Sequence, residues 1–297
     1  MSPPPTRDTR SGEVYNDLRN LAKRANRDVA EYLTMHALEG LLARLTISDQ
    51  SQDFILKGGV LMAAFAARRP TRDLDFLASG FDNHVDECVR RFRDIAAIPL
   101  DDGLVFDAGS IRAEIIRDEG NYTGVRVHLK VSLSSAKIAL HADVNFGDPI
   151  WPAPVITELP CLLGGTLPLL SYPDHMVLAE KIVTAIERGT ANTRWRDFVD
   201  IDHFLGSRTF SHSDIRQALK TVADFRHVDL RPLVLILDDM AEIAQPKWTT
   251  WRRKHRLEDS TPESFGDLLA RCIAFADPAL TGGSLGLTWY PEQQVWK

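Results

Sequence analysis

The chain has 297 residues, of which 44% are hydrophobic and 26% are charged, and its formal net charge at pH 7 is −6. These values are typical of a folded globular protein and exclude a low-complexity or collagen-like chain. They also exclude a protein coated with positive charge, but not a local basic surface for nucleic acid. Because no apolar run is long enough to span a bilayer and the N-terminus has no signal-peptide pattern, we expect a cytoplasmic protein with no membrane partner.

The first 56 residues predict a tail, two helices and a strand. Residues 1–10 are polar and rich in proline, which predicts a disordered tail. Apolar residues at helical spacing predict helices over 12–25 and 28–45. The apolar segment 54–56 then predicts a short strand.

A glycine pair, Gly58 and Gly59, follows this strand and precedes an alanine-rich segment that predicts a helix over 61–68. Glycine lets a phosphate approach the backbone closely, and the N–H groups at the start of a helix favour anions. We therefore predict that this turn binds the phosphates of a nucleotide. Lys57, directly before the turn, is interpreted as either a plain surface lysine or a residue with a phosphate-binding or structural role.

The next segment, 73–78, predicts a strand that carries two acids. Side chains alternate along a strand, so Asp73 and Asp75 leave the same face while the residue between them enters the core. Two adjacent acids repel each other, and Mg²⁺ relieves that repulsion while it bridges carboxylates to substrate phosphates. We predict a site for Mg²⁺ and a nucleoside triphosphate (NTP) here; the alternative interpretation is a solvated strand face.

After a polar helix over 81–97, hydrophobic and polar residues alternate along 103–146, which predicts antiparallel strands. This alternation places Asp143 on the polar face of a central strand. Three carboxylates on neighbouring strands could hold two metal ions, so Asp143 is a candidate third metal ligand that activates the acceptor hydroxyl; the alternative is an exposed strand carboxylate without such a role. Five prolines between 147 and 170 predict an irregular linker, and we place the main domain boundary there.

From Pro173 onward the pattern predicts helices, beginning with 174–188 and 194–205. Lys181 on the first of these is interpreted as either a triphosphate-binding residue or an exposed lysine paired with an acid. On the second, Asp197 is interpreted as a residue that orients Lys181 or Arg194.

Arg196 and Asp200 are spaced for an ordinary ion pair on that second helix. Further on, the segment 247–256 mixes cations with tryptophans. It is interpreted as either a helix with buried tryptophans and a solvated basic side, or a nucleic-acid contact in which cations meet phosphates and rings stack on bases.

These motifs resemble the AbiEii family of nucleotidyltransferase-like toxins, which includes the MenT toxins. The family has a lysine–glycine–glycine turn and then an R-x-T-x-D-[LI]-D-F motif, and both match here, at 57–59 and 69–76. Its later strand acid, followed by a glycine–acid pair, resembles Asp143 with Gly147 and Asp148. Its helix lysine resembles Lys181, and its R-x-x-D-[FL]-x-D-[LI] segment resembles 194–201.

The resemblance implies an α+β fold. A polymerase-β-type nucleotidyltransferase domain, a mixed sheet with helices, would cover 11–160, and a mainly helical domain at 161–297 would complete the active site. The implied activity is that of a type IV toxin, which transfers a nucleoside monophosphate from an NTP to the 3′ end of tRNA and so blocks aminoacylation and translation. The implied partners are the NTP, the tRNA acceptor end and a cognate antitoxin on a separate chain.

The resemblance also implies roles for individual residues. Asp73 and Asp75 would ligate Mg²⁺, Lys181 would bind the triphosphate and Asp197 would support the site. Thr71, just before the acid pair, is a candidate for regulatory phosphorylation, which would add about −2 charge beside the metal site. The predicted metal ligands are Asp73, Asp75 and Asp143, and the predicted nucleotide-binding residues are Lys57, Gly58, Gly59, Arg72, Lys181 and Arg194.

Two alternative functions use the same residues. One is nucleotidylation of a protein or of a small molecule, which would need no basic surface at 248–256. The other is a regulatory module that binds a nucleotide without turnover. The adjacent acid pair argues against such a module, because binding alone does not need two neighbouring carboxylates.

Overall fold

The computed structural model describes residues 5–65, 71–117, 123–282 and 286–297. The chain forms two compact units. The first consists of Met1–Asp148 with Pro154–Tyr172, and the second of Pro149–Ala153 with Pro173–Lys297. In the described part of the chain, no helix combines the length and the apolar character needed to cross a bilayer.

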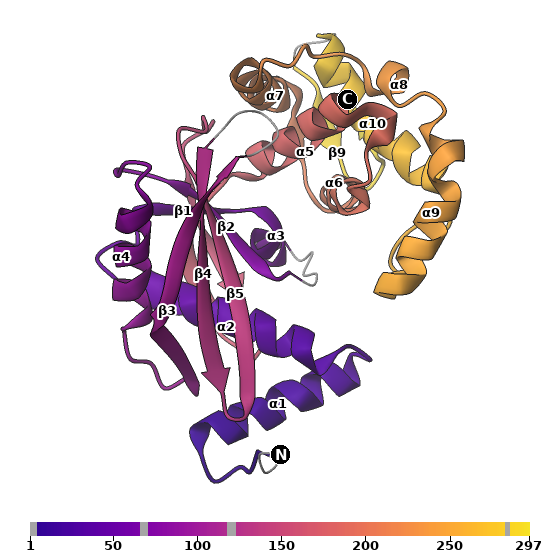
Figure 1. Cartoon of the computed structure of the whole chain (residues 1–297). Helices are drawn as coiled ribbons and strands as arrows, with labels where there is room; N and C mark the ends of the chain where they lie inside the picture. Colours follow the sequence, from indigo (N-terminus) through magenta and orange to yellow (C-terminus); the bar gives the residue numbers. More distant parts are fainter. Residues whose placement is uncertain (1–4, 66–70, 118–122, 283–285) are drawn as a thin grey trace. The chain divides into compact units, whose positions relative to one another are not determined.

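The first unit is built on a seven-stranded mixed sheet with the strand order β3-β4-β5-β2-β1-β7-β6. The strands β1 to β5 are labelled in Figure 1. The strand β2 lies in the middle, antiparallel to β1 and parallel to β5. The strands are β1 (Phe54–Lys57), β2 (Asp73–Ala78), β3 (Leu104–Arg117), β4 (Thr123–Leu133), β5 (Ala136–Asn145), β6 (Val155–Pro160) and β7 (Thr166–Ser171).

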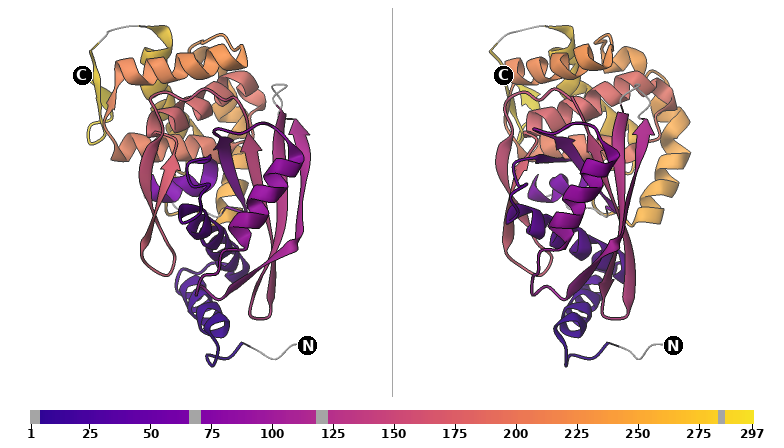
Figure 2. Two further views of the ribbon diagram at one scale, coloured as in Figure 1. Left: turned by 90° about the vertical axis from the view of Figure 1, so that its left-hand side faces the viewer. Right: turned by 60° about the vertical axis from the view of Figure 1, so that its left-hand side comes forward.

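The helices of the first unit are α1 (Arg10–Arg24), α2 (Val29–Thr46), α3 (Gly58–Leu61) and α4 (Val85–Ala96), with a 3₁₀ turn η1 (Met62–Phe65). Side chains of Thr9 and Asp28 accept hydrogen bonds from backbone N–H groups at the starts of α1 and α2. The helix α4 packs across β3 and β4 (Figure 2), and α2 packs against β5 and β7.

The core of this unit lies on the apolar face of the sheet. Leu74 and Phe76 of β2 are buried there, as the alternation of side chains predicts. The rings of Phe54 and Phe92 contact Phe76 edge-on, at centroid distances of 5.4 and 6.4 Å. The opposite face therefore carries the polar residues of β2, β4 and β5.

Most predicted elements of this unit are confirmed, with shifted ends. The alanine-rich helix begins at Gly58 instead of Leu61 and becomes a 3₁₀ turn at Met62, while the predicted residues 66–68 lie outside the described part of the chain. The polar helix predicted over 81–97 begins only at Val85, because the backbone turns first: the His84 N–H donates to the Asp82 carbonyl.

The predicted tail, 1–10, is described from residue 5 onward. The helix α1 already begins at Arg10, so this end of the tail prediction is wrong. Before the helix, Arg7 forms an ion pair with Asp17, and the carbonyl of Pro5 accepts a hydrogen bond from Asn16. The described end of the segment therefore contacts α1 through polar groups.

The irregular linker predicted over 147–170 is wrong. Residues 155–160 and 166–171 form the hairpin of β6 and β7, and the Tyr172 N–H donates to the carbonyl of Leu56 in β1. The prolines are tolerated because neither interrupts a ladder of hydrogen bonds in the middle of the sheet. Pro160 is the last residue of the edge strand β6, and β7 pairs with β1 only at Ser171, three residues after Pro168.

The second unit is mainly helical, as predicted. Its helices are α5 (Asp174–Arg188), α6 (Trp195–Ser207), α7 (His212–Arg226), α8 (Leu233–Ile236), α9 (Met240–His255) and α10 (Phe265–Thr281), with a 3₁₀ turn η2 (Gly189–Ala191). A small antiparallel sheet has the order β10-β9-β8, formed by β8 (Phe210–Ser211), β9 (Thr288–Tyr290) and β10 (Val295–Trp296).

The helix α10 is central in this unit, because it contacts α6, α7, α8 and α9. Its Phe275 packs edge-on against Trp289 at 5.1 Å and stacks on Trp296 at 5.0 Å. Trp289 is fully buried, and its indole N–H donates to the carbonyl of Leu205 at the end of α6. Aromatic packing therefore connects the small sheet to the helices.

Candidate active site

The predicted acid pair lies in the middle of the sheet of the first unit. Asp73 and Asp75 stand on the polar face of β2, while Leu74 between them is buried on the other face. Asp73 is exposed and Asp75 is partly buried. The strand thus holds two neighbouring carboxylates on one side, as the sequence predicts.

The glycine turn lies directly against Asp75. Gly58 has a φ of +70°, and a Cβ atom at this position would lie 1.9 Å from Asp75 Oδ2. The Gly59 N–H donates a hydrogen bond to the same carboxylate. Only glycine fits at position 58, because a side chain would clash with Asp75 and the left-handed backbone disfavours other residues. The close approach predicted for a phosphate is thus made to Asp75; binding of a nucleotide by Gly58 and Gly59 stays a prediction.

Lys57 stands opposite Asp75 in the register of β1 and β2, and its side chain is buried. Its Nζ lies 2.6 Å from Asp148 Oδ2 and 5.3 Å from the centre of the Tyr172 ring. Asp148 is the acid of the glycine–acid pair that follows Asp143. Its ion pair with Lys57 connects the end of β1 to the segment after β5, a contact that the sequence does not show. A phosphate-binding role for Lys57 stays a prediction.

Asp143 stands opposite Asp75 on the other side, in the register of β2 and β5. Both of its oxygens accept hydrogen bonds from Arg126 of β4, from Nε and Nη2, each at 2.7 Å. Arg126 is not among the site residues predicted from the sequence. The strict alternation of β4 places it on the polar face, but only the register with β5 places it opposite Asp143.

Charge repulsion at this site affects Asp75. Burial, and next to it the negative charge of Asp73, raise the pKa of Asp75 from 3.8 to about 6. The charge of Asp143 also raises it, whereas Lys57 and the hydrogen bond from Gly59 lower it. Burial and the neighbouring acids outweigh these two effects, so Asp75 keeps a proton more readily than an ordinary aspartate.

The donor chemistry of Asp73 and Asp75 fits Mg²⁺. Two carboxylates on one strand face, with an uncompensated repulsion between them, match a hard cation that takes its remaining ligands from water and substrate phosphates. Among the described residues, however, no group of three or more histidine, cysteine or acidic side chains is arranged to hold a metal ion. The role of Asp143 as a third metal ligand stays a prediction.

A second charged cluster lies within the second unit. The buried Nζ of Lys181 on α5 lies 3.0 Å from Asp197 Oδ1 and 2.7 Å from Asp200 Oδ2, both on α6. Asp197 also pairs with Arg194, 3.0 Å away. Asp197 thus contacts both cations that it is predicted to orient, and Asp200 is an additional partner of Lys181, which is paired with acids but buried instead of exposed. The spacing of the two acids by three residues on one helix is the signal that could have identified Asp200.

Arg72 and Thr71 precede the acid pair. Arg72 is exposed, and its predicted contact with nucleotide stays a prediction. Thr71 is buried and lines a small, mainly apolar pocket together with Gly59 and Leu38. A kinase could reach its hydroxyl only if this segment opened locally, so the predicted phosphorylation carries an additional structural requirement.

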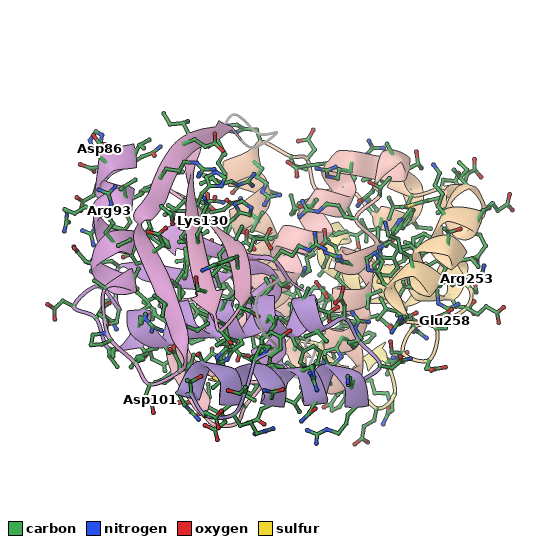
Figure 3. All side chains as sticks on the ribbon, turned by 60° about the horizontal axis from the view of Figure 1, so that its bottom comes forward. Asp86, Arg93, Asp101, Lys130, Arg253 and Glu258 are labelled. Carbon is green, nitrogen blue, oxygen red and sulfur yellow. The ribbon has the colours of Figure 1, made fainter. Side chains whose placement is uncertain are left out.

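The basic segment 247–256 lies on α9 and after its end. Trp248 is buried, as is Arg252, which donates to the Thr261 hydroxyl and to the carbonyls of Glu258 and Thr261. Arg252 therefore belongs to the fold and is unsuitable for testing nucleic-acid binding. Lys247, Arg253 and Lys254 are exposed, and Arg253 extends from α9 in Figure 3.

A comparison with known families decides the assignment. The family model described as nucleotidyl transferase AbiEii toxin, of type IV toxin–antitoxin systems, matches residues 40–271. The chain belongs to the AbiEii family of nucleotidyltransferase toxins. The match includes Asp73, Asp75, Asp143, Lys181 and Asp197. Together with the mixed sheet and its helices, it confirms the predicted fold class, and membership of this family implies a transferase activity and an antitoxin partner.

No curated protein matches the AbiEii chain. Among solved structures, it is similar to a candidate nucleotidyltransferase from H. pylori, with 14% identity, coverage of 83% of this chain and 94% of that chain, and a TM-score of 0.47. It is also similar to JHP933 from Helicobacter pylori, with 15% identity, coverage of 83% and 97%, and a TM-score of 0.41.

Proposed function

We propose that this AbiEii protein is a Mg²⁺-dependent nucleotidyltransferase that transfers a nucleoside monophosphate from an NTP to the 3′ end of tRNA. The observation that carries this proposal is the pair of carboxylates on the polar face of β2, with the glycine turn against one of them. A protein that only bound nucleotides would gain nothing from two neighbouring carboxylates, one of which has a pKa raised by burial and by the charge of the other.

In the proposed reaction, the oxygen of the acceptor hydroxyl forms a bond to the α-phosphorus of the NTP. The bond between the α-phosphorus and the bridging oxygen breaks, pyrophosphate leaves, and the hydroxyl proton passes to solvent. Asp73 and Asp75 would hold Mg²⁺, which neutralises charge on the transferred phosphate when it is bound. The turn at Gly58 and Gly59 fixes the Asp75 carboxylate through the Gly59 N–H.

The exposed cations of α9 favour RNA as the acceptor. In the part of the chain that the structure describes, Lys247, Arg253 and Lys254 form no ion pair with an acid, although the protein as a whole is acidic. Unpaired cations on one helix, next to the partly exposed ring of Trp251, suit a phosphate backbone with unstacked bases. Nucleotidylation of a protein or a small molecule is the competing function, and it would not need these residues.

The proposal includes a biological consequence. A nucleotide added to the acceptor end of tRNA blocks aminoacylation, so the protein would stop translation until its antitoxin, encoded as a separate chain, neutralised it. Such a toxin would act in the cytoplasm, where tRNA is charged.

The experiment uses the purified full chain, Mg²⁺ and total tRNA with each of the four α-³²P-labelled NTPs in turn. We expect label on tRNA with at least one NTP and none with Asp73→Asn. Label on protein would support the competing function. An NTP that binds to the wild type and to Asp73→Asn without transfer of label would support a regulatory module and contradict the proposal.

A further inference from the structure

A row of charged side chains crosses the polar face of the first unit. In the strand register, Arg126 of β4 stands opposite Asp143 of β5, Asp143 opposite Asp75 of β2, and Asp75 opposite Lys57 of β1. Residues paired in this way project from the same face, and neighbouring strands lie about 4.8 Å apart. Arg126 is therefore two strands from Asp75, with Asp143 between them.

The two cations of this row differ in their exposure to solvent, and therefore in their access to a ligand. Lys57 is buried against Asp148 and Tyr172. The side chain of Arg126 is 40% exposed, whereas that of Asp143 is only 14% exposed. The carboxylate thus lies beneath a guanidinium that faces outward.

Arg126 has unused hydrogen-bond donors. A guanidinium has five N–H donors, and Asp143 accepts one from Nε and one from Nη2. Within the described residues, Nη1 of Arg126 donates to no other group. The remaining donors form a planar edge, the geometry with which arginine binds phosphate oxygens.

Asp143 is well suited to fix this edge. Its two oxygens hold the guanidinium in one plane by two parallel hydrogen bonds, so the arginine is oriented before a ligand arrives. The same contact takes one acceptor position on each oxygen and holds a positive charge against the carboxylate, which would repel a metal ion bound there. The arrangement thus favours a role for Asp143 through Arg126 over direct metal ligation.

We propose that Arg126 binds the triphosphate of the NTP and that Asp143 positions it for this contact. This inference rests on the proposed function, because it places an NTP at Asp73 and Asp75. It assigns Asp143 to the phosphate site instead of the metal site and adds a residue, Arg126, to the substrate-binding surface.

The test separates phosphate binding from metal binding, both measured without turnover. Titration calorimetry with inorganic triphosphate in Mg²⁺ follows the first, and titration with Mn²⁺ alone follows the second. We expect Arg126→Gln to weaken triphosphate binding about tenfold, the effect of one charge-assisted phosphate contact. Asp143→Asn should weaken it about threefold, and it should have no further effect once Arg126 is replaced, because it acts through the arginine.

Controls separate this role from a general loss of charge or of fold. Arg112→Gln removes an exposed cation from the same face of β3 and should leave triphosphate binding unchanged. Arg126→Lys keeps the charge without the planar fork and should bind triphosphate with intermediate strength. Mn²⁺ binding should be the same in the wild type, Arg126→Gln and Asp143→Asn, which also shows that the variants are folded.

Two results would overturn the inference in different ways. If Asp143→Asn abolishes Mn²⁺ binding while Arg126→Gln binds triphosphate as the wild type does, then Asp143 is a metal ligand and the proposed function survives. If the wild type binds neither triphosphate nor any NTP, the proposed function itself fails, and this inference fails with it.

Discussion

At the scale of single residues, Asp75 connects the site to protein stability. In the unfolded chain it ionises near pH 3.8, whereas in the folded, metal-free protein it ionises near pH 6. Between these values the unfolded state loses the proton first, so the free energy of unfolding should fall as the pH rises from 4 to 6. We expect Asp75→Asn to remove this fall and to stabilise the protein at pH 7 by about 1–3 kcal/mol.

Urea unfolding in EDTA at pH 4.5 to 7.5 measures this effect. Asp259→Asn, a change at an exposed acid, should keep the pH dependence of the wild type. If Asp75→Asn also keeps it, Asp75 does not have the raised pKa that its burial and the charges of Asp73 and Asp143 imply.

Gly58 gives a second prediction at this scale. Gly58→Ala places a Cβ where Asp75 Oδ2 now lies and strains a backbone with a φ of +70°. We expect a loss of about 1–3 kcal/mol in the free energy of unfolding and at least about a tenfold loss of nucleotidyl transfer, because the carboxylate must move.

The matched control is Gly206→Ala on α6, where no atom lies within 4 Å of the added carbon. It should be neutral or stabilising by up to about 1 kcal/mol, because alanine favours the helix. Equal effects of the two substitutions, measured by thermal unfolding and label transfer, would refute the role given to Gly58.

The sequence predicts which residues carry charge at the site but not their partners. Asp73 and Asp75 follow from period-two alternation along one strand, which is a local property. The contact between Arg126 and Asp143 depends on the register of two neighbouring strands. The contact between Lys57 and Asp148 joins residues that are 91 positions apart in the sequence. No spacing within a single element contains that information.

At the scale of elements, the buried cluster joins α5 to α6. Lys181→Met would leave Asp197 and Asp200 without their shared cation in a buried position. We expect a loss of about 3–5 kcal/mol in the free energy of unfolding. Lys220→Met, which breaks an exposed ion pair with Asp224 on α7, should cost less than about 1 kcal/mol.

Urea unfolding compares the two variants directly. A Lys181→Met protein as stable as the wild type that has lost nucleotidyl transfer would show that Lys181 serves the reaction and contributes little to the fold. Its predicted role in triphosphate binding would then have direct support.

The helix α9 gives a prediction about the acceptor. Replacing Lys247, Arg253 and Lys254 together by Gln should weaken tRNA binding. The slope of log K against the logarithm of the salt concentration should become shallower by about 2, because about three phosphate contacts disappear. Filter binding at several salt concentrations measures both. Replacing Lys130, Lys137 and Arg231, three exposed cations elsewhere, changes the net charge equally and should leave the salt dependence unchanged. If both triple variants lose the same amount of tRNA affinity and of salt dependence, this would argue against an RNA contact on α9.

Elements with strong periodicity were predictable, and elements with prolines were not. The helices α2 and α5 and the strands β2, β4 and β5 follow from apolar spacing over many residues. The hairpin of β6 and β7 was missed because its prolines suppress the strand signal, although they occupy positions where a missing N–H costs little. On α9, burial of Trp248 and Arg252 depends on the segment 257–265, which periodicity within the helix does not reveal.

At the scale of the whole molecule, the fold class and the family were predictable because two local motifs, the glycine turn and the acid strand, resemble those of the family whose model matches residues 40–271. The predicted boundary between residues 160 and 161, the tRNA acceptor and the use of Mg²⁺ stay predictions. In the structure, β7 pairs with β1, so that residues 154–172 belong to the first unit. The composition of the segment does not indicate this pairing, because the two strands are far apart in the sequence.

The central claim is that nucleotides are added to the acceptor end of tRNA, and sequencing of tRNA 3′ ends tests it most directly. Total tRNA is incubated with NTPs, Mg²⁺ and either the wild type or Asp75→Asn. We expect extra nucleotides beyond the mature 3′ end with the wild type and none with the variant. Unchanged 3′ ends, under conditions in which the wild type consumes NTP and releases pyrophosphate, would contradict the claim and direct the search to a protein or small-molecule acceptor.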